Sequence, residues 1–307
     1  MSPPSRVVRS GKRRFYSGTA LSLVDSTGIA DPVGAIEHLT KQLLDDCEVT
    51  QAPVPLKMLA SFCGAADVQV GDIKESGRLT PLKEGGYRIE IRASDPLGRR
   101  SFSFAHEIGH LLMPNYQIHP VPKVDACTGE FSLQNEEEYF CDMAAANLLL
   151  PDTILRRRCS EIAPSIDALI GLANEFEASI EAVALRVDHL SAWDCTPVVW
   201  EMALKPSQRQ SEDQTSLFGS DEVPPPAEEF RVKFHAGRQG AFFPVAKHVP
   251  MDCEMVQCCL TEGVYRGRCV IPTSESDMHC YAEAKLVHYR NEKGEVSQRI
   301  VSLVFPQ

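Results

Sequence analysis

Residues 101–112, with the sequence SFSFAHEIGHLL, contain the motif H-E-x-x-H and decide how the fold of this chain is interpreted. Apolar residues recur here at helical spacing, which predicts that the motif lies on a helix. Residues four apart share a helix face, so His106 and His110 can both reach one metal ion. Glu107 lies on the adjoining face, within reach of a water molecule at that ion. A zinc hydrolase needs this arrangement, although the five residues alone fit equally well a helix with two histidines on its polar face.

The bulk composition restricts the class of protein. A chain of 307 residues with 43% hydrophobic residues can form a sizeable core and has room for two domains. Its formal net charge of −11 argues against direct binding to nucleic acid, because neutralising phosphates requires a basic surface. The sequence therefore favours a globular protein that acts on something other than nucleic acid.

Cysteine usage and hydropathy indicate the compartment. Eleven cysteines are an odd number in a chain too long for a small disulfide scaffold. No signal peptide is expected, because the apolar run 20–24 is too short for one, and no apolar run has the length of a membrane span. These features predict a soluble, cytoplasmic protein with mostly reduced thiols and no membrane partner.

Signals for helix, strand and linker divide the chain into four parts. Residues 1–30 are predicted to be a basic, flexible arm, with phosphate binding or partner docking as the alternative; its cations are Arg6, Arg9, Lys12, Arg13 and Arg14. Residues 31–203 combine helices with short strands between Val68 and Arg92. Residues 204–228 are polar and rich in proline, which is typical of a linker. Residues 229–307 are strand-like, with residues 291–295 as a hairpin turn, and predict a β-rich second domain.

A third metal ligand must come from outside the motif, because catalytic zinc sites use three protein ligands and leave a fourth position for water. A metzincin is excluded, since it needs Gly and His where this chain has Met113 and Tyr116. A zincin whose third ligand is a glutamate needs an acid on a later helix. The predicted helix from 135 to 150 offers Glu138 as this ligand, and Asp142, four residues on, can fix the tautomer of a bound histidine. An ordinary acidic helix start remains the alternative.

At these residues the chain resembles the ImmA/IrrE metallopeptidases, over about residues 31–195. Residues 99–112 are similar to the family pattern R-x-R-F-T-x-A-H-E-x-G-H-x-x, and residues 138–151 to E-x-x-A-N-x-F-A-x-x-L-L-M-P. A weaker third similarity covers residues 178–186. The departures are Cys141 for the family's Ala, Asp142 for its Asn and Ala144 for its Phe. They alter packing more than ligation, and they leave Glu137 open as the third ligand in place of Glu138.

The resemblance implies the fold and the activity. The expected fold class is α+β, with a zincin-like metallopeptidase domain followed by the β-rich C-terminal domain. The expected activity is that of a zinc endopeptidase: His106, His110 and Glu138 hold Zn²⁺, and Glu107 acts on the water as general base. His119 and Tyr116 are candidate oxyanion donors, with ordinary loop residues as the alternative. Cys127, between the ligand segments, is a less favoured candidate for a thiolate ligand.

Family members typically cleave a helix-turn-helix repressor or an antitoxin, which links them to the excision of phage-like elements and to stress responses. This chain shows no helix-turn-helix before the peptidase segment, so the expected partner is a separate protein. The alternatives are a regulatory binding protein that keeps the fold without turnover, and a toxin-antitoxin-like component that docks a partner through residues 229–307. The intact Glu107 favours the enzyme, because a disused site has no need of a general base.

Overall fold

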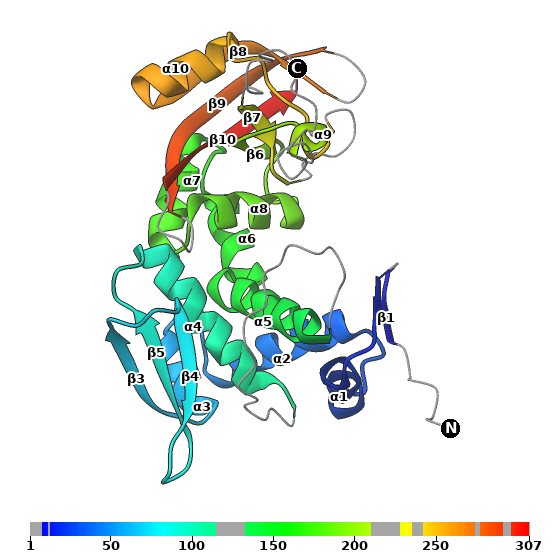
Figure 1. Ribbon diagram of the computed structural model, residues 1–307, viewed down its shortest axis with the longest axis vertical. Helices are drawn as coiled ribbons and strands as arrows, with labels where there is room; N and C mark the ends of the chain where they lie inside the picture. The colour runs from blue at the N-terminus through cyan, green and yellow to red at the C-terminus, as the bar shows by residue number, and fades with distance from the viewer. Residues whose placement is uncertain are drawn as a thin grey trace, which may run out of the picture. The chain divides into compact units, whose positions relative to one another are not determined.

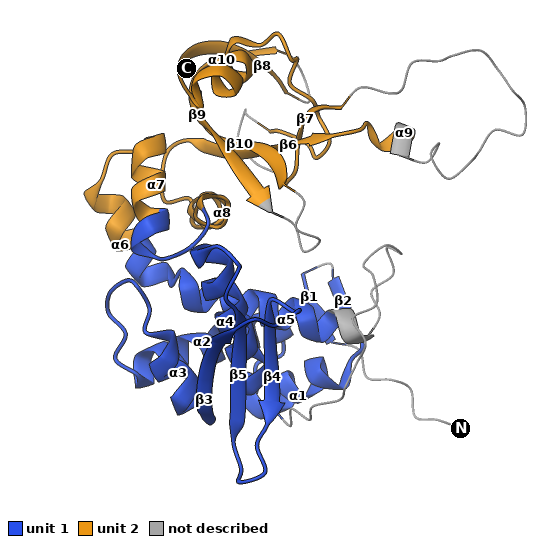
Figure 2. Ribbon diagram, turned by 60° about the vertical axis from the view of Figure 1, so that its left-hand side comes forward, with its two compact units in different colours: residues 1–155, 173–179 blue, residues 156–172, 180–307 orange. Residues whose placement is uncertain are grey.

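The computed structural model describes residues 8–11, 13–114, 133–209, 228–234, 242–273, 277–290 and 296–306. Its helices and strands are arranged as in Figure 1. The chain forms two compact units, coloured separately in Figure 2: residues 1–155 with 173–179, and residues 156–172 with 180–307. Both units combine helices with strands, so the predicted α+β class is confirmed. Within the described ranges, no helix is long and apolar enough to cross a membrane.

The N-terminal residues differ from the predicted flexible arm, because they fold onto the first unit. They form the hairpin β1 (Val8–Ser10) and β2 (Arg13–Phe15), followed by α1 (Gly18–Thr27). The described cations of this segment are exposed, whereas Phe15 is fully buried with its ring centroid 5.1 Å from that of Phe140. The basic composition predicted a solvated tail. The structure differs because the apolar residues Val8 and Phe15 of this segment are buried in the core. Docking of this segment on a separate partner remains untested.

A small mixed sheet follows two helices, α2 (Pro32–Asp46) and α3 (Leu56–Phe62). The sheet has the order β3-β5-β4, with β3 (Ala65–Gly71), β4 (Gly77–Pro81) and β5 (Tyr87–Arg92). The central strand β5 runs parallel to β3 and antiparallel to β4, which leaves β4 at an edge. Ile89 and Ile91 of β5 are buried on one face of the sheet, as the period of two predicts.

The H-E-x-x-H helix begins directly after this sheet. Arg92, at the end of β5, donates hydrogen bonds to Asp95 Oδ1, to Ser76 Oγ and to the carbonyl of Lys74. These bonds fix both the turn into α4 (Leu97–Leu112) and the chain just before β4. The next described helix is α5 (Leu133–Leu149), which packs against α4. The sheet and α5 thus flank the helix that carries the motif.

The second unit contains a five-stranded antiparallel sheet of order β7-β6-β10-β9-β8. Its strands are β6 (Thr196–Ala203), β7 (Glu229–Val232), β8 (Val264–Pro272), β9 (Asp277–Arg290) and β10 (Val296–Pro306). The helices after α5 are α6 (Asp152–Glu161), α7 (Ile166–Glu175), α8 (Ile180–Leu190), α9 (Pro206–Arg209) and α10 (Glu254–Glu262). The boundary between the units falls within α6 and α7.

This sheet changes the domain limits that the sequence suggested. Residues 229–307 supply four of the strands, but β6 pairs with both β7 and β10. The structure therefore places Thr196–Ala203 in the second unit, and not in the predicted domain 31–203. Most of the predicted linker lies outside the described residues, as does the predicted turn at 291–295, although β9 and β10 on either side of that turn do pair.

We expect the substitution Phe15→Ala to lower the free energy of unfolding by about 3–5 kcal/mol, because it removes a fully buried aromatic ring from the core. Tyr16→Ala is the matched control, since Tyr16 is exposed, and should change stability by no more than about 0.5 kcal/mol. Urea unfolding monitored by circular dichroism measures both. Equal stability of the two variants would mean that the N-terminal segment does not pack as described.

Candidate metal centre

The two helices of the candidate site approach each other closely at Gly109. A Cβ atom added to Gly109 would lie 3.0 Å from Cys141 Cα, 3.1 Å from the Cys141 carbonyl oxygen and 3.2 Å from Ala144 Cβ. Any side chain would therefore push α5 away from α4. The glycine inside the H-E-x-x-H motif and the alanine-rich centre of α5 bring the ligand-bearing faces of the two helices together.

α4 buries polar side chains on its inner surface, which is unusual for a helix of a soluble protein. Glu107 and His110 are each only 8% exposed. Ser103, one turn before Glu107, is also buried. Burial of ionisable groups is costly unless they have partners, so this face is expected to serve a ligand or a reaction.

The rings of His106 and His110 converge on one carboxylate of α5. His106 Nε2 lies 3.3 Å from Glu138 Oε2, and His110 Nε2 lies 3.8 Å from Glu138 Oε1. The ring centroids of the two histidines are 5.0 Å apart. Glu138 therefore faces the same two nitrogen atoms that would point at a shared ion.

Other carboxylates contact the opposite nitrogen of each ring. His106 Nδ1 is 2.9 Å from Asp142 Oδ1, and His110 Nδ1 is 3.3 Å from Glu137 Oε1. An ionised carboxylate only accepts hydrogen bonds, so Nδ1 of His106 has to donate to Asp142. In the neutral ring this leaves the Nε2 lone pair available to a metal ion.

Glu137 has a support of its own from the N-terminal segment. Thr19 Oγ1 donates a hydrogen bond of 3.1 Å to Glu137 Oε2. The hydrogen bond with His110 lowers the pKa of the Glu137 carboxyl below its usual value. The neighbouring Glu136, only 1% exposed, accepts hydrogen bonds from the backbone N–H groups of Tyr16 and Ser17. Of the three consecutive acids, Glu136 thus binds the N-terminal backbone, whereas Glu137 and Glu138 contact opposite nitrogens of the His110 ring.

Glu107 lies on the sheet side of α4. A Cβ atom on Gly77 would come within 2.6 Å of Glu107 Oε1, so the carboxylate rests against the backbone of the edge strand β4. The absence of a side chain at Gly77 makes room for it. This packing restricts where the Glu107 carboxylate can go and keeps it close to the two histidines on the same helix.

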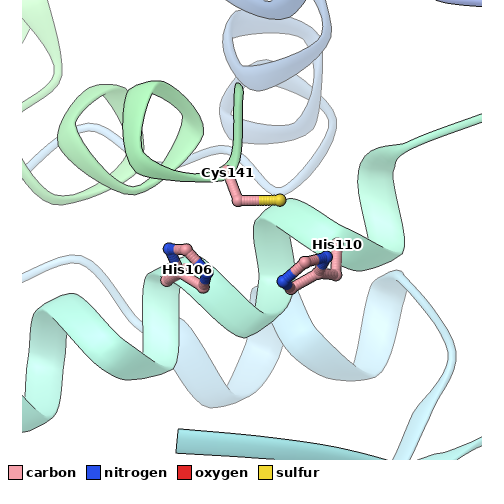
Figure 3. A group of neighbouring side chains, drawn as sticks. All are labelled: His106, His110 and Cys141. Carbon is pink, nitrogen blue, oxygen red and sulfur yellow. The ribbon is translucent and has the colours of Figure 1, made fainter. Parts of the chain in front are cut away.

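Cys141 is the part of the site that the sequence interpretation did not include. Its Sγ atom and one ring nitrogen each of His106 and His110 lie within 4.8 Å of one another. Figure 3 shows the three side chains. The spacing Glu138-x-x-Cys141 was the available signal, because residues three apart share a helix face. Burial raises the pKa of this thiol well above its usual value, and the negative charges of Glu138 and three further carboxylates raise it more.

The structure thus brings together His106, His110, Glu138, Asp142, Glu137 and Cys141, with Glu107 on the same helix as the histidines. The histidines with Glu138 or Cys141 are the residues that could hold a metal ion. The predicted oxyanion donors Tyr116 and His119, and the predicted alternative ligand Cys127, lie outside the described residues.

Comparison with known proteins gives a family match for part of the chain. Residues 65–188 match the family model described as the IrrE N-terminal-like domain of the M78 peptidases, so the resemblance to the ImmA/IrrE family is confirmed for this segment. The chain is also 26% identical over 160 residues to the radiation response metalloprotease IrrE of Deinococcus radiodurans. That match covers 51% of this chain and 45% of the relative, so the chain spans less than half of the length of the relative.

A solved structure shares the fold over most of the chain. It is a transcriptional regulator of Mycobacterium tuberculosis, with a TM-score of 0.52 and 10% sequence identity. The similarity covers 94% of this chain and 79% of that one. At this level of identity, the comparison shows a shared fold.

The pKa of His106 gives a test of the site in the metal-free protein. Burial of the ring by itself lowers this pKa, but hydrogen bonds with Asp142 and Glu138 outweigh burial and raise it from 6.5 to about 9. We expect NMR titration to find His106 near that value, and Asp142→Asn to lower the pKa because the amide carries no charge. The exposed Asp46→Asn is the control and should leave it unchanged.

The raised pKa of His106 also makes the stability of the folded protein depend on pH. Below pH 6.5 His106 is protonated in both the folded and the unfolded protein, so its stabilising contribution to the free energy of unfolding is complete there. This contribution is lost as the pH rises through about 9. Metal binding competes with this proton and should strengthen over the same range. An unperturbed His106 pKa in the wild type would contradict the described contacts.

Proposed function

We propose that this chain, whose residues 65–188 match the IrrE N-terminal-like domain, is a zinc-dependent endopeptidase. In this proposal His106, His110 and Glu138 bind the ion. The observation that carries it is the position of the Glu138 carboxylate, 3.3 Å from Nε2 of His106 and 3.8 Å from Nε2 of His110. The two oxygens of this one carboxylate on α5 thus face the two imidazoles of α4.

The donor set fits zinc by distance and by chemistry. Two nitrogen or oxygen ligands of a tetrahedral zinc ion are about 3.3–3.5 Å apart, given metal–ligand distances of about 2.0–2.2 Å. The separations from Glu138 are close to that range. Two imidazoles and one carboxylate are a ligand set of hydrolytic zinc sites, and they leave a fourth position for water.

The geometry also supports a zincin-like arrangement of the first unit. β5 leads directly into the helix with the histidines, and Glu107 borders the edge strand β4. Many zincins place an edge strand beside the bound substrate, so β4 is the strand along which we expect the substrate to lie. This inference is an analogy between folds.

The chain's own residues supply the remaining chemistry. A bound zinc ion lowers the pKa of water to about 7 and polarises the carbonyl of the scissile bond. Glu107 then takes the proton of the attacking water and passes it to the leaving amine. The packing against Gly77 holds its carboxylate for both transfers. Asp142 keeps the His106 imidazole in the tautomer that binds the ion, and Glu137 contacts the far nitrogen of His110. Tyr116 and His119 stay predicted donors to the oxyanion.

The proposed substrate is a separate protein in the cytoplasm, a helix-turn-helix repressor or an antitoxin. This part of the proposal rests on the resemblance to the ImmA/IrrE family. A relative carries the name radiation response metalloprotease, which is consistent with a proteolytic step in a stress response.

The second candidate is a regulatory protein that keeps this fold without turnover. The observation in its favour is the shared fold with a protein named a transcriptional regulator. Because a fold hosts many functions, only the chemistry of the site distinguishes the two candidates. A buried general base beside a set of metal donors supports the enzyme.

We predict that Glu107→Gln lowers the rate of cleavage by about 10²–10⁴-fold while zinc binding stays the same, because the amide cannot accept a proton. The zinc-loaded protein is incubated with host-cell extract, and new N-termini in that extract are counted by mass spectrometry. Glu37→Gln, an exposed acid on α2, is the control and should cleave as the wild type does.

The outcomes separate the two candidates. New N-termini in a DNA-binding protein, produced by the wild type and by Glu37→Gln only, would support the endopeptidase. Zinc binding without any cleavage would favour the regulatory protein. Cleavage by Glu107→Gln at the wild-type rate would show that Glu107 is not the base.

A further inference from the structure

Cys141 gives this site a fourth side chain that is able to bind a metal ion. In the part of the chain that the structure describes, the Cys141 sulfur and one ring nitrogen each of His106 and His110 form a group of donors that all lie within 4.8 Å of one another. Figure 3 shows the sulfur of Cys141 on the side of α5 that faces the two imidazoles. Glu138 lies one helical turn before Cys141 and faces the same histidines.

Packing alone accounts for a small apolar residue at this position. Cys141 is fully buried in a cluster with Phe15, Phe140 and Ala144. The matching position in the ImmA/IrrE pattern is alanine, which would satisfy that packing. A thiol adds a donor for which zinc and other soft ions have a high affinity.

The distances allow the sulfur to reach a bound ion. A zinc-bound thiolate and a zinc-bound imidazole nitrogen lie about 3.6 Å apart, from metal–ligand distances of about 2.3 and 2.0–2.1 Å. The three donor atoms already lie within 4.8 Å of one another. The sulfur therefore has to approach by about 1.2 Å at most.

We propose that the Cys141 thiolate is a fourth ligand, which closes the metal site in its resting form. The proposal rests on the proposed function, because it needs an ion held by His106, His110 and Glu138. On binding, the sulfur gives up its proton to solvent and takes the position that the attacking water would need. Sites with four protein ligands are structural, and those with three are catalytic. Cleavage then requires that the sulfur leave.

Cobalt substitution tests the ligand directly, apart from any activity. A thiolate bound to Co²⁺ gives a charge-transfer band in the near ultraviolet, which nitrogen and oxygen ligands do not give. We expect the band in the Co²⁺-loaded wild type and its loss in Cys141→Ala. Cys259→Ala is the matched control, because Cys259 is equally buried but lies in α10 of the second unit, and should keep the band.

A measurement on the wild type guards against misfolding of the variant. X-ray absorption at the zinc edge should find one sulfur atom at about 2.3 Å together with nitrogen or oxygen ligands at about 2.0–2.2 Å. Cys141→Ala should also cleave at least tenfold faster than the wild type, since the water position is then always free.

The failure of this proposal is distinguishable from the failure of the proposed function. The role of Cys141 is overturned if cobalt gives identical spectra in the wild type and in Cys141→Ala, and if X-ray absorption finds no sulfur bound to zinc. The three-ligand site would still stand. If neither cobalt nor zinc binds at His106 and His110, both the proposed function and the role of Cys141 are overturned.

Discussion

The close contact between α4 and α5 at Gly109 is the constraint on which the rest of the site depends. With 3.0 Å between a notional Cβ of Gly109 and Cys141 Cα, the helices approach as nearly as their backbones permit. At this separation the Glu138 carboxylate lies 3.3 Å from His106 and 3.8 Å from His110. The glycine of the motif is thus a structural requirement, and the histidines on either side of it depend on it.

Three consecutive glutamates in the first turns of α5 make different contacts. Successive residues of a helix point about 100° apart, so three consecutive acids reach different surroundings. Glu136 holds the backbone of Tyr16 and Ser17, Glu137 contacts His110, and Glu138 faces both histidines. The N-terminal segment is therefore fastened to the same helix that carries the proposed metal ligands.

The sequence could predict the parts of the site that depend on local spacing. The four-residue interval places His106 and His110 on one face, and the acids of α5 were correctly expected on a following helix. The choice between Glu137 and Glu138 depends on the rotation of α5 about its axis, which local periodicity does not define. That rotation is set by tertiary packing, in which Gly109 of α4 lies against Cys141 and Ala144 of α5. It also turns Cys141 toward the histidines, although its substitution for alanine had suggested a change of packing alone.

Long-range pairing explains the errors in the domain limits. Glu136 and the backbone of Tyr16 are 120 residues apart in sequence, so composition could not reveal that they bind each other. The strand β6 similarly pairs with β10 about a hundred residues later, as in the pair of Val199 and Val301. Composition alone predicted where the N-terminal segment and β6 belong. Their positions instead depend on contacts with residues about a hundred or more positions later in the sequence.

The central claim is that the two packed helices hold one metal ion through His106, His110 and Glu138. Anomalous diffraction at the zinc edge from crystals of the zinc-loaded protein tests it most directly. We predict one ion about 2.0–2.2 Å from Nε2 of each histidine and from an oxygen of Glu138. Zinc bound at a different place, or crystals without ordered zinc between α4 and α5, would contradict it.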